Sequence, residues 1–176
     1  MFDNFYKYFN TSNITSSNSI EEFKGNNAGK SFGNGLYHIF NKEDSEKWTK
    51  ILTDTIPVYK DKVIAFGHDW IGKIYFYNIE DKNVGFLDPF DCKTYSTDID
   101  FIKFHNEEIV TTDGECFAPL YYNAYLEKNN NNYIKYNRCA GYKVPIFLGG
   151  EDVVDNLEDT DLDVNWHMTI NLYKTI

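Results

Sequence analysis

In the first half of the chain, short apolar runs alternate with polar connections, a pattern typical of a β-meander. The apolar runs predict strands at residues 36–40, 63–66, 73–79, 84–87 and 94–96, and the connections between the later runs are 67–69, 80–83 and 88–91. Connections this short join antiparallel neighbours. The sequence therefore predicts a mostly antiparallel sheet from Leu36 to about Ser96.

Apolar residues at helical spacing predict helices before, within and after this region. Phe2, Phe5, Tyr6 and Phe9 indicate an amphipathic opening helix, and the polar residues 10–19 that follow indicate a surface loop. Asn41 is placed to cap a helix near 43–56, which Pro57 ends. Further helices are predicted near 98–110, capped by Asp98, and near 114–126, opened by Asp113. The fold class is thus α+β: one compact unit in which a mostly antiparallel sheet packs against several helices.

The tail, residues 161–174, fits two patterns. Leu162, Val164, Trp166 and Met168 alternate like a strand, but Leu162 and Trp166 also share a helical face with Ile170. The prediction is a helix.

The stretch from Cys139 to Trp166 is the long run whose residue order looks most specific. Gly141, Pro145, Gly149 and Gly150 flank the apolar run 144–148, which predicts a short extended segment entering a tight turn. We expect Pro145, Ile146, Phe147 and Leu148 to be largely buried. Phe147→Ala should then cost about 3 to 5 kcal/mol, because it would leave a phenyl-sized cavity.

Acidic residues dominate the segment that follows. Seven of the thirteen residues from 151 to 163 are acidic: Glu151, Asp152, Asp155, Glu158, Asp159, Asp161 and Asp163. Residues 149–176 hold these seven acids and one lysine, so −6 of the formal net charge of −10 lies there. Three interpretations stay open: a solvated face, a calcium site and a partner-binding surface. The ligand order of a calcium loop is absent.

The negative charge bears on the class of partner. Nucleic acids and anionic membranes bind basic surfaces, so neither is expected here, and a basic protein fits better. The N-terminal residues do not resemble a signal peptide, and no apolar run approaches the ~20 residues of a membrane-spanning helix. We expect a cytoplasmic location.

Residues with catalytic potential form no recognised motif. His105-Asn-Glu-Glu lacks the second histidine of a zinc protease, so it is predicted to be a solvated helix face. His68-Asp69 is predicted to lie in a turn, with no accompanying nucleophile motif. Cys92, Cys116 and Cys139 fit neither a zinc spacing nor a disulfide framework, which favours reduced, mostly buried thiols. No catalytic residue, cofactor or metal is predicted. An enzyme using His68 or a cysteine remains a third hypothesis.

Two strings resemble a known family. Residues 141–152, GYKVPIFLGGED, followed by Asn156-Leu-Glu and Trp166, resemble the C-terminal domain of immunity proteins paired with type VI secretion DNase toxins. Residues 32–40, FGNGLYHIF, resemble the GAD-like domain that often precedes it. The resemblance implies a GAD-like portion at 1–97 and an immunity-protein portion at 98–176.

The resemblance also implies a function. The chain would bind and neutralise a cognate secreted toxin, a nuclease in this family, as a bacterial cytoplasmic protein that is monomeric when free. The acidic run would supply the electrostatic attraction, since opposite charge speeds protein association. The family has no accepted catalytic motif, so no catalytic residue is carried over. The alternative is a non-enzymatic regulatory module that binds a partner unrelated to toxins.

Overall fold

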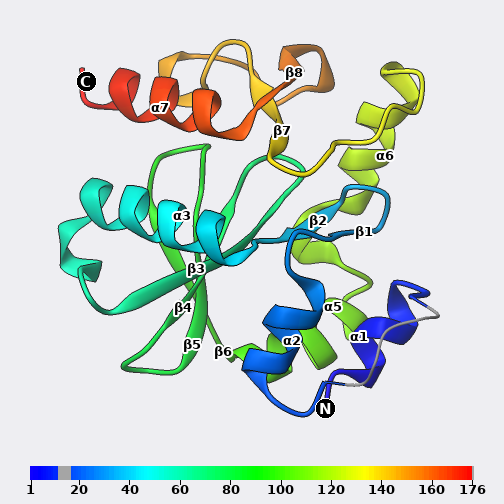
Figure 1. Ribbon diagram of the computed structural model, residues 1–176. Helices are drawn as coiled ribbons and strands as arrows, with labels where there is room; N and C mark the ends of the chain where they lie inside the picture. The colour runs from blue at the N-terminus through cyan, green and yellow to red at the C-terminus, as the bar shows by residue number, and fades with distance from the viewer. Residues whose placement is uncertain (12–16, 176) are drawn as a thin grey trace.

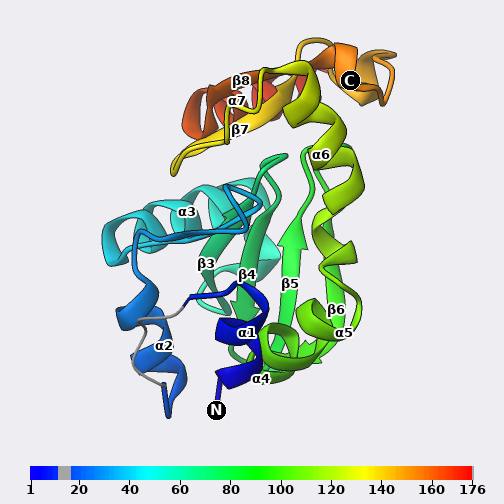
Figure 2. The same ribbon diagram turned by 90° about the vertical axis from the view of Figure 1, so that its right-hand side faces the viewer.

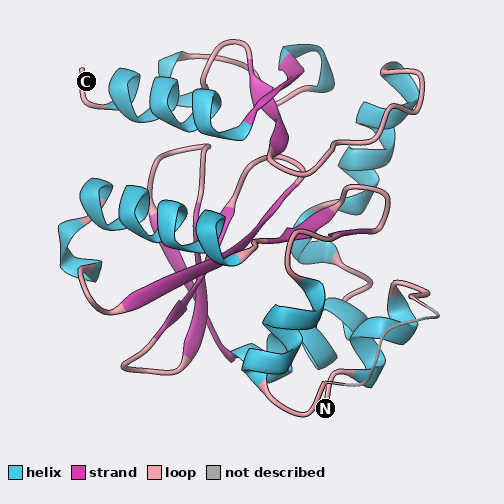
Figure 3. Ribbon diagram, in the orientation of Figure 1, coloured by secondary structure: helices cyan, strands magenta, loops and turns pink. Residues whose placement is uncertain are grey.

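The computed structural model describes residues 1–11 and 17–175. Its centre is a sheet whose strands follow one another in chain order: β1 (Ser31–Phe32), β2 (Tyr37–Ile39), β3 (Val63–Asp69), β4 (Ile74–Asn78), β5 (Asn83–Leu87) and β6 (Thr94–Asp100). Every neighbouring pair is antiparallel (Figures 1 and 3). The predicted meander and the α+β class are confirmed.

A second, two-stranded sheet lies at one end of the large one. It pairs β7 (Arg138–Tyr142) with β8 (Leu157–Asp161), antiparallel, and α7 (Leu162–Tyr173) packs against both (Figures 1 and 2). The tail from Leu162 is therefore a helix, as predicted, and Asp161 caps it by accepting the N–H groups of Asp163 and Val164. We call β7, the loop 143–156, β8 and α7 the C-terminal unit.

Helices surround the central sheet. They are α1 (Asp3–Tyr8), α2 (Ile20–Asn27), α3 (Lys42–Thr55), α4 (Phe101–Lys103), α5 (Ile109–Thr111) and α6 (Pro119–Lys128), with a π turn (Phe104–Glu108) between α4 and α5. Short 3-10 turns occupy Pro57–Tyr59, Glu115–Phe117, Ile146–Leu148 and Val154–Asn156. Asn41 caps α3, and the helix ends at Thr55, just before Pro57. The predicted surface loop 10–19 falls partly outside the described residues.

Two hydrophobic clusters fill the two faces of the sheet, because side chains alternate along each strand. Val63 and Ala65 of β3 pack with Trp48 of α3 and with Trp166 of α7. The neighbouring Phe66 packs on the other face, with aromatic side chains of the N-terminal helices and of the 101–126 helices. Figure 2 shows α3 and α6 on opposite sides of the strands.

Several sequence-based boundaries were wrong, for local reasons. Asp98 has a left-handed φ of 57° and bonds Ser96, so the cap of the next helix is Asp100, whose carboxylate accepts the Ile102 and Lys103 N–H groups. Asp113 likewise has positive φ, and α6 begins later, with Pro119 at its first position, where the missing N–H costs nothing.

No helix in the described ranges combines the length and the apolar character needed to cross a membrane. The predicted boundary between residues 97 and 98 falls inside β6, which runs from Thr94 to Asp100.

Candidate functional site

The acidic run lies in the loop 143–156, in β8 and at the start of α7. Six of its seven carboxylates belong to exposed residues, and Asp163 is half-buried. Three of them pair with basic side chains: Asp155 with Lys128, Asp159 with Arg138 Nε at 2.7 Å, and Asp163 with Lys47 Nζ at 2.8 Å. Asp155 and Asp163 thus connect the C-terminal unit to α6 and α3, and Asp159 connects β8 to β7 within the unit. The basic side chains of these three ion pairs neutralise part of the negative charge of the acidic run.

The other acids divide into two groups. Asp161 caps α7, and Asp152 accepts a hydrogen bond of 2.8 Å from the Tyr142 hydroxyl. Glu151 and Glu158 make no side-chain hydrogen bond or ion pair to any described residue. The charge available to a partner is therefore greatest at these two glutamates.

The loop 143–156 is held closed by one asparagine. The Asn156 side chain accepts from the Val144 N–H at 3.0 Å and donates to the carbonyls of Val144 and Glu151 at 2.8 and 2.9 Å. Gly149 has a φ of 88°, and a Cβ on Gly150 would lie 1.9 Å from the Val144 carbonyl oxygen. Both glycines are needed for this turn. The loop is thus a compact surface feature with its own internal bonds.

The expected burial of residues 145–148 was wrong. Ile146–Leu148 form a 3-10 turn; Pro145, Ile146 and Phe147 are half-buried and Leu148 is 43% exposed. Pro145 and the two glycines bend the chain away from the sheet, so this apolar run has no strand partner. Phe147 contacts Tyr173 edge to face, with ring centroids 5.3 Å apart. Phe147→Ala should consequently cost less than the 3 to 5 kcal/mol of a fully buried phenyl group.

Gly141 allows close packing inside the C-terminal unit, and Trp166 connects this unit to the central sheet. A Cβ on Gly141 would lie 2.3 Å from Asn165 Oδ1, so only glycine allows β7 to approach α7 this closely. Trp166 has no exposed surface, and its Nε1–H donates to the Gly72 carbonyl at 2.8 Å. The Ala140 N–H donates to the Trp70 carbonyl at 2.7 Å. The β3–β4 turn, residues 70–72, is therefore the joint between the two sheets.

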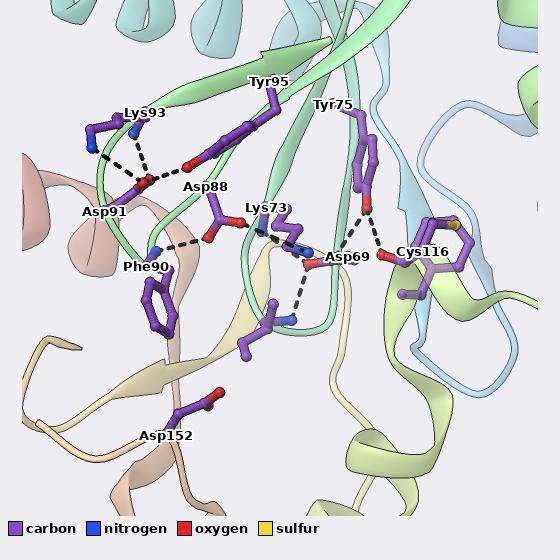
Figure 4. A network of polar contacts seen from close by, with 12 residues as sticks. Asp69, Lys73, Tyr75, Asp88, Phe90, Asp91, Lys93, Tyr95, Cys116 and Asp152 are labelled. Atoms are coloured by element: carbon purple, nitrogen blue, oxygen red, sulfur yellow. Dashed lines mark hydrogen bonds and ion pairs between the residues drawn. The ribbon is translucent and has the colours of Figure 1, made fainter. Parts of the chain in front are cut away.

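A buried aspartate organises that turn. Asp69 has no exposed surface, and its carboxylate accepts from the Ile71 and Lys73 N–H groups at 3.2 and 2.9 Å. The Tyr75 hydroxyl donates to its second oxygen at 3.2 Å (Figure 4). Burial raises the pKa of Asp69 to about 7, although the nearby Lys73 and its N–H act in the opposite direction.

The prediction that His68 and Asp69 lie in a turn was wrong. They end β3 instead: the strand continues past Phe66 because Gly67 pairs with Ile39 of β2 and with Tyr75 of β4. The sequence signal for a strand end here is the large apolar residue on each side, Phe66 and Trp70, because an exposed turn is seldom flanked by two such residues. The sequence did not identify Asp69 as a buried acid.

A cavity of about 160 Å³ opens between this turn and the C-terminal unit. Its lining includes Asp69, Lys73, Asp88, Tyr121, Tyr142 and Asp152. Lys73 Nζ lies 3.8 Å from Asp88 Oδ2, and burial raises the pKa of Asp88 (Figure 4). Of the acidic run, Asp152 is the member that reaches this cavity. The site is therefore negatively charged and small, suited to one cationic group rather than to an extended ligand.

The histidines and cysteines do not form an activated pair in the described residues. Burial lowers the pKa of His38 to about 4 and that of His105 to about 3, and holds that of His68 well below its ordinary value. Burial also raises the pKa of Cys92 and of Cys116 to about 12. Imidazoles with lowered pKa values are weak bases, and thiols with raised pKa values stay protonated, so neither favours activation of a nucleophile.

His105 was predicted to lie on a solvated helix face, and this was wrong. It is fully buried: Nδ1 bonds the Phe101 carbonyl at 2.9 Å, and Nε2 bonds the Tyr37 hydroxyl at 2.9 Å. The aromatic cluster of α1, α2 and α4 surrounds the ring. Among the described residues, no group of three or more potential ligands could hold a metal ion.

Comparison with protein-family models finds no match, and neither does comparison with curated proteins. Solved structures with a similar fold include Atu4351 from Agrobacterium tumefaciens, with a TM-score of 0.61 and 17% sequence identity, over 97% of this chain and 88% of that one. At this identity the similarity shows a shared α+β fold that extends over nearly the whole chain, the C-terminal unit included.

Proposed function

We propose that this protein is an immunity protein, which binds a cognate secreted toxin, a nuclease, and holds it in a tight inactive complex. The observation that carries the proposal is the loop 143–156. It exposes Val144, Leu148 and Val153, at 49, 43 and 41%, and it also carries Glu151 and Asp152. Apolar side chains with a polar surround are the anatomy of a protein interface.

The rigidity of the loop supports this use. Asn156 and the two glycines fix its shape before any partner arrives, so little conformational entropy is lost on binding. The resemblance of residues 141–152 to immunity-protein C-terminal domains concerns this same loop. The negative charge of this protein supports a nuclease as the partner, because a nuclease is basic where it binds phosphate.

The proposed mechanism needs no chemistry on this chain. The exposed glutamates attract the basic surface of the toxin and raise the association rate, and the apolar side chains of the loop then hold the complex together. Inhibition follows because the protein covers the surface that the toxin uses for its nucleic acid.

The direct test is co-expression with a candidate nuclease toxin, sought first among the products of the adjacent genes. The expected result is that cells survive and that the two proteins purify together as one complex. A toxin that stays fully active beside an equimolar amount of this protein would overturn the proposal.

The electrostatic part is tested with Glu151→Gln combined with Glu158→Gln. These two are chosen over Asp155, Asp159 and Asp161, whose carboxylates pair with bases or cap α7. Association should slow at low salt and depend less on salt, and dissociation should change little, because steering acts on the association rate. Stopped-flow measurements over a salt series give both rates.

The matched control is Glu107→Gln combined with Glu127→Gln, two exposed glutamates without ion pairs on the 101–128 helices. It removes the same charge elsewhere. If both double variants slow association equally, the total charge matters and the loop does not.

For the apolar part, Leu148→Ser should speed dissociation about tenfold or more, whereas Leu120→Ser, at an 84% exposed position on α6, should not.

A further inference from the structure

A second opening, far from the C-terminal unit, has the opposite character. It lies between α2, the start of β3, the end of β4 and α4, and has a volume of about 470 Å³. Figure 2 shows α2 and α4 near the end of the sheet that is opposite to the C-terminal unit. We call this opening the α2 groove.

Apolar side chains form most of the α2 groove. Phe66 and Phe101 are almost fully buried, and their rings lie 4.9 Å apart, edge to face. Tyr77 contacts Phe101 in the same manner at 6.2 Å, and Ile64 is 36% exposed beside them. The volume and the aromatic lining are those of a pocket for a small organic molecule.

Two lysines also line the α2 groove, Lys24 from α2 and Lys82 from the β4–β5 turn. Neither lies within 4.0 Å of a carboxylate in the part of the chain that the structure describes. Both ammonium groups are therefore available to an anionic ligand at this opening.

Glu21 is the acid among the described lining residues, and it leaves the opening with a net positive charge. Burial lowers the pKa of Lys24, which shows that its ammonium group is partly removed from water, while Glu21 nearby has the opposite effect. A partly desolvated ammonium group is stabilised by an anion that hydrogen-bonds to it.

We propose that the α2 groove binds a small amphipathic carboxylate, whose aliphatic or aromatic body lies on Ile64, Phe66, Tyr77 and Phe101 and whose carboxylate lies between Lys24 and Lys82. The groove matches such a molecule in both volume and charge. A second copy of this chain is disfavoured as occupant, because two molecules of charge −10 repel each other. The proposal is independent of toxin binding, since no lining residue belongs to the loop 143–156.

The test uses octanoate and its neutral analogue octanamide, titrated into the full chain and followed by NMR. Octanoate should bind at one site, about tenfold more tightly than octanamide. Non-specific binding predicts the reverse order, because an acidic protein repels an anion. Shift changes should centre on the backbone of Ile64, Tyr77 and Lys82.

Variants separate the lysines from charge in general. Lys24→Gln combined with Lys82→Gln should weaken octanoate binding about tenfold and leave octanamide unchanged. The matched control is Lys30→Gln combined with Lys135→Gln, two exposed lysines without ion pairs, which should change it less than twofold. Ile64→Glu should abolish binding of both ligands, and thermal denaturation checks that each variant is folded.

Three results would overturn the proposal: no saturable octanoate binding at millimolar concentration, equal affinity for the two ligands, or equal losses in the two lysine double variants. A dimer that Ile64→Glu dissociates would also overturn it, because a second copy would then fill the groove. Toxin binding by the Lys24→Gln, Lys82→Gln protein should equal that of the wild type, so failure here leaves the immunity proposal standing.

Discussion

Asp69, at the joint between the two sheets, and the aspartates of the acidic run carry the same carboxyl group but lie in opposite environments. Asp69 has no exposed surface and is held by two backbone N–H groups and one hydroxyl. Asp159 is exposed and is held by one arginine. Asp69 is fixed by hydrogen-bond donors that would lose an acceptor without it. Asp159 is fixed by an arginine whose charge water could equally solvate. A count of acids along the sequence does not separate these roles.

The difference also shows how the molecule is assembled. Asp69 shapes the β3–β4 turn, and the carbonyls of that turn receive the C-terminal unit through Ala140 and Trp166. The ion pairs of Asp155, Asp159 and Asp163 close the periphery of the unit. The joint should therefore carry most of the stability, and the acidic run should remain free to vary for binding.

The largest expected effect is that of Asp69→Ala. It removes the acceptor of the Ile71 and Lys73 N–H groups and leaves the buried Tyr75 hydroxyl with only the Cys116 carbonyl at 3.4 Å, so the free energy of unfolding should fall by about 3 kcal/mol or more. Chemical denaturation measures it. Asp159→Ala, the comparison from the acidic run, should cost about 1 kcal/mol at most. Similar losses in the two variants would remove the distinction between joint and surface.

The next effect is a pH dependence that belongs to Asp69 alone. Its pKa is about 7 in the folded protein, and an unfolded aspartate has a pKa near ~3.9. Between these values the folded state binds the extra proton, so this carboxyl adds stability at low pH that is lost as pH rises toward 7. Above about 7 its contribution is constant.

The buried histidines act in the opposite direction over part of that range. The folded pKa of His38 is about 4 and that of His105 about 3, so the unfolded state takes up protons first as pH falls below ~6.5. The Asp69 part is therefore measured as a difference. Stability of the wild type minus that of Asp69→Asn should decrease from pH 4 to pH 7. A difference that is constant across this interval would mean that Asp69 is ionised throughout. Asp159→Asn is the control, with no such trend expected.

Most of the fold could be predicted because its signals are local. The β3–β4, β4–β5 and β5–β6 connections are short, Asn41 and Pro57 bracket α3, and the apolar face of α7 repeats at helical spacing. The two-residue strand β1 and the pairing of β7 with β8 were missed. β7 and β8 are separated by the loop 143–156, and nothing in either strand alone specifies its partner.

The site was less predictable, because it depends on contacts between distant residues. The apolar run 144–148 looks like a core strand in sequence, yet Pro145 and Gly149 turn it into an exposed loop. His105 looks solvent-facing beside Asn106 and Glu107, yet the π turn and the aromatic cluster bury it. The cavity at Asp69 collects residues from β3, the β5–β6 connection, α6 and the C-terminal unit. Only the tertiary arrangement brings them together.

The smallest expected effects distinguish two acids inside the acidic run itself. Asp161 accepts two N–H groups at the start of α7, so Asp161→Ala should lower the free energy of unfolding by about 1 kcal/mol, as loss of a helix cap does. Glu158 lies on the same strand, makes no hydrogen bond or ion pair through its side chain to the described residues, and Glu158→Ala should change stability by less than about 0.5 kcal/mol. Asp161→Asn is the control, since asparagine also caps helices and should restore most of the loss. Guanidinium denaturation of the three variants gives the comparison. Equal losses at 158 and 161 would mean that the run acts as one structural element. The expected inequality would mean that β8 carries both structural carboxylates and a free one, and that the free one is available to a partner.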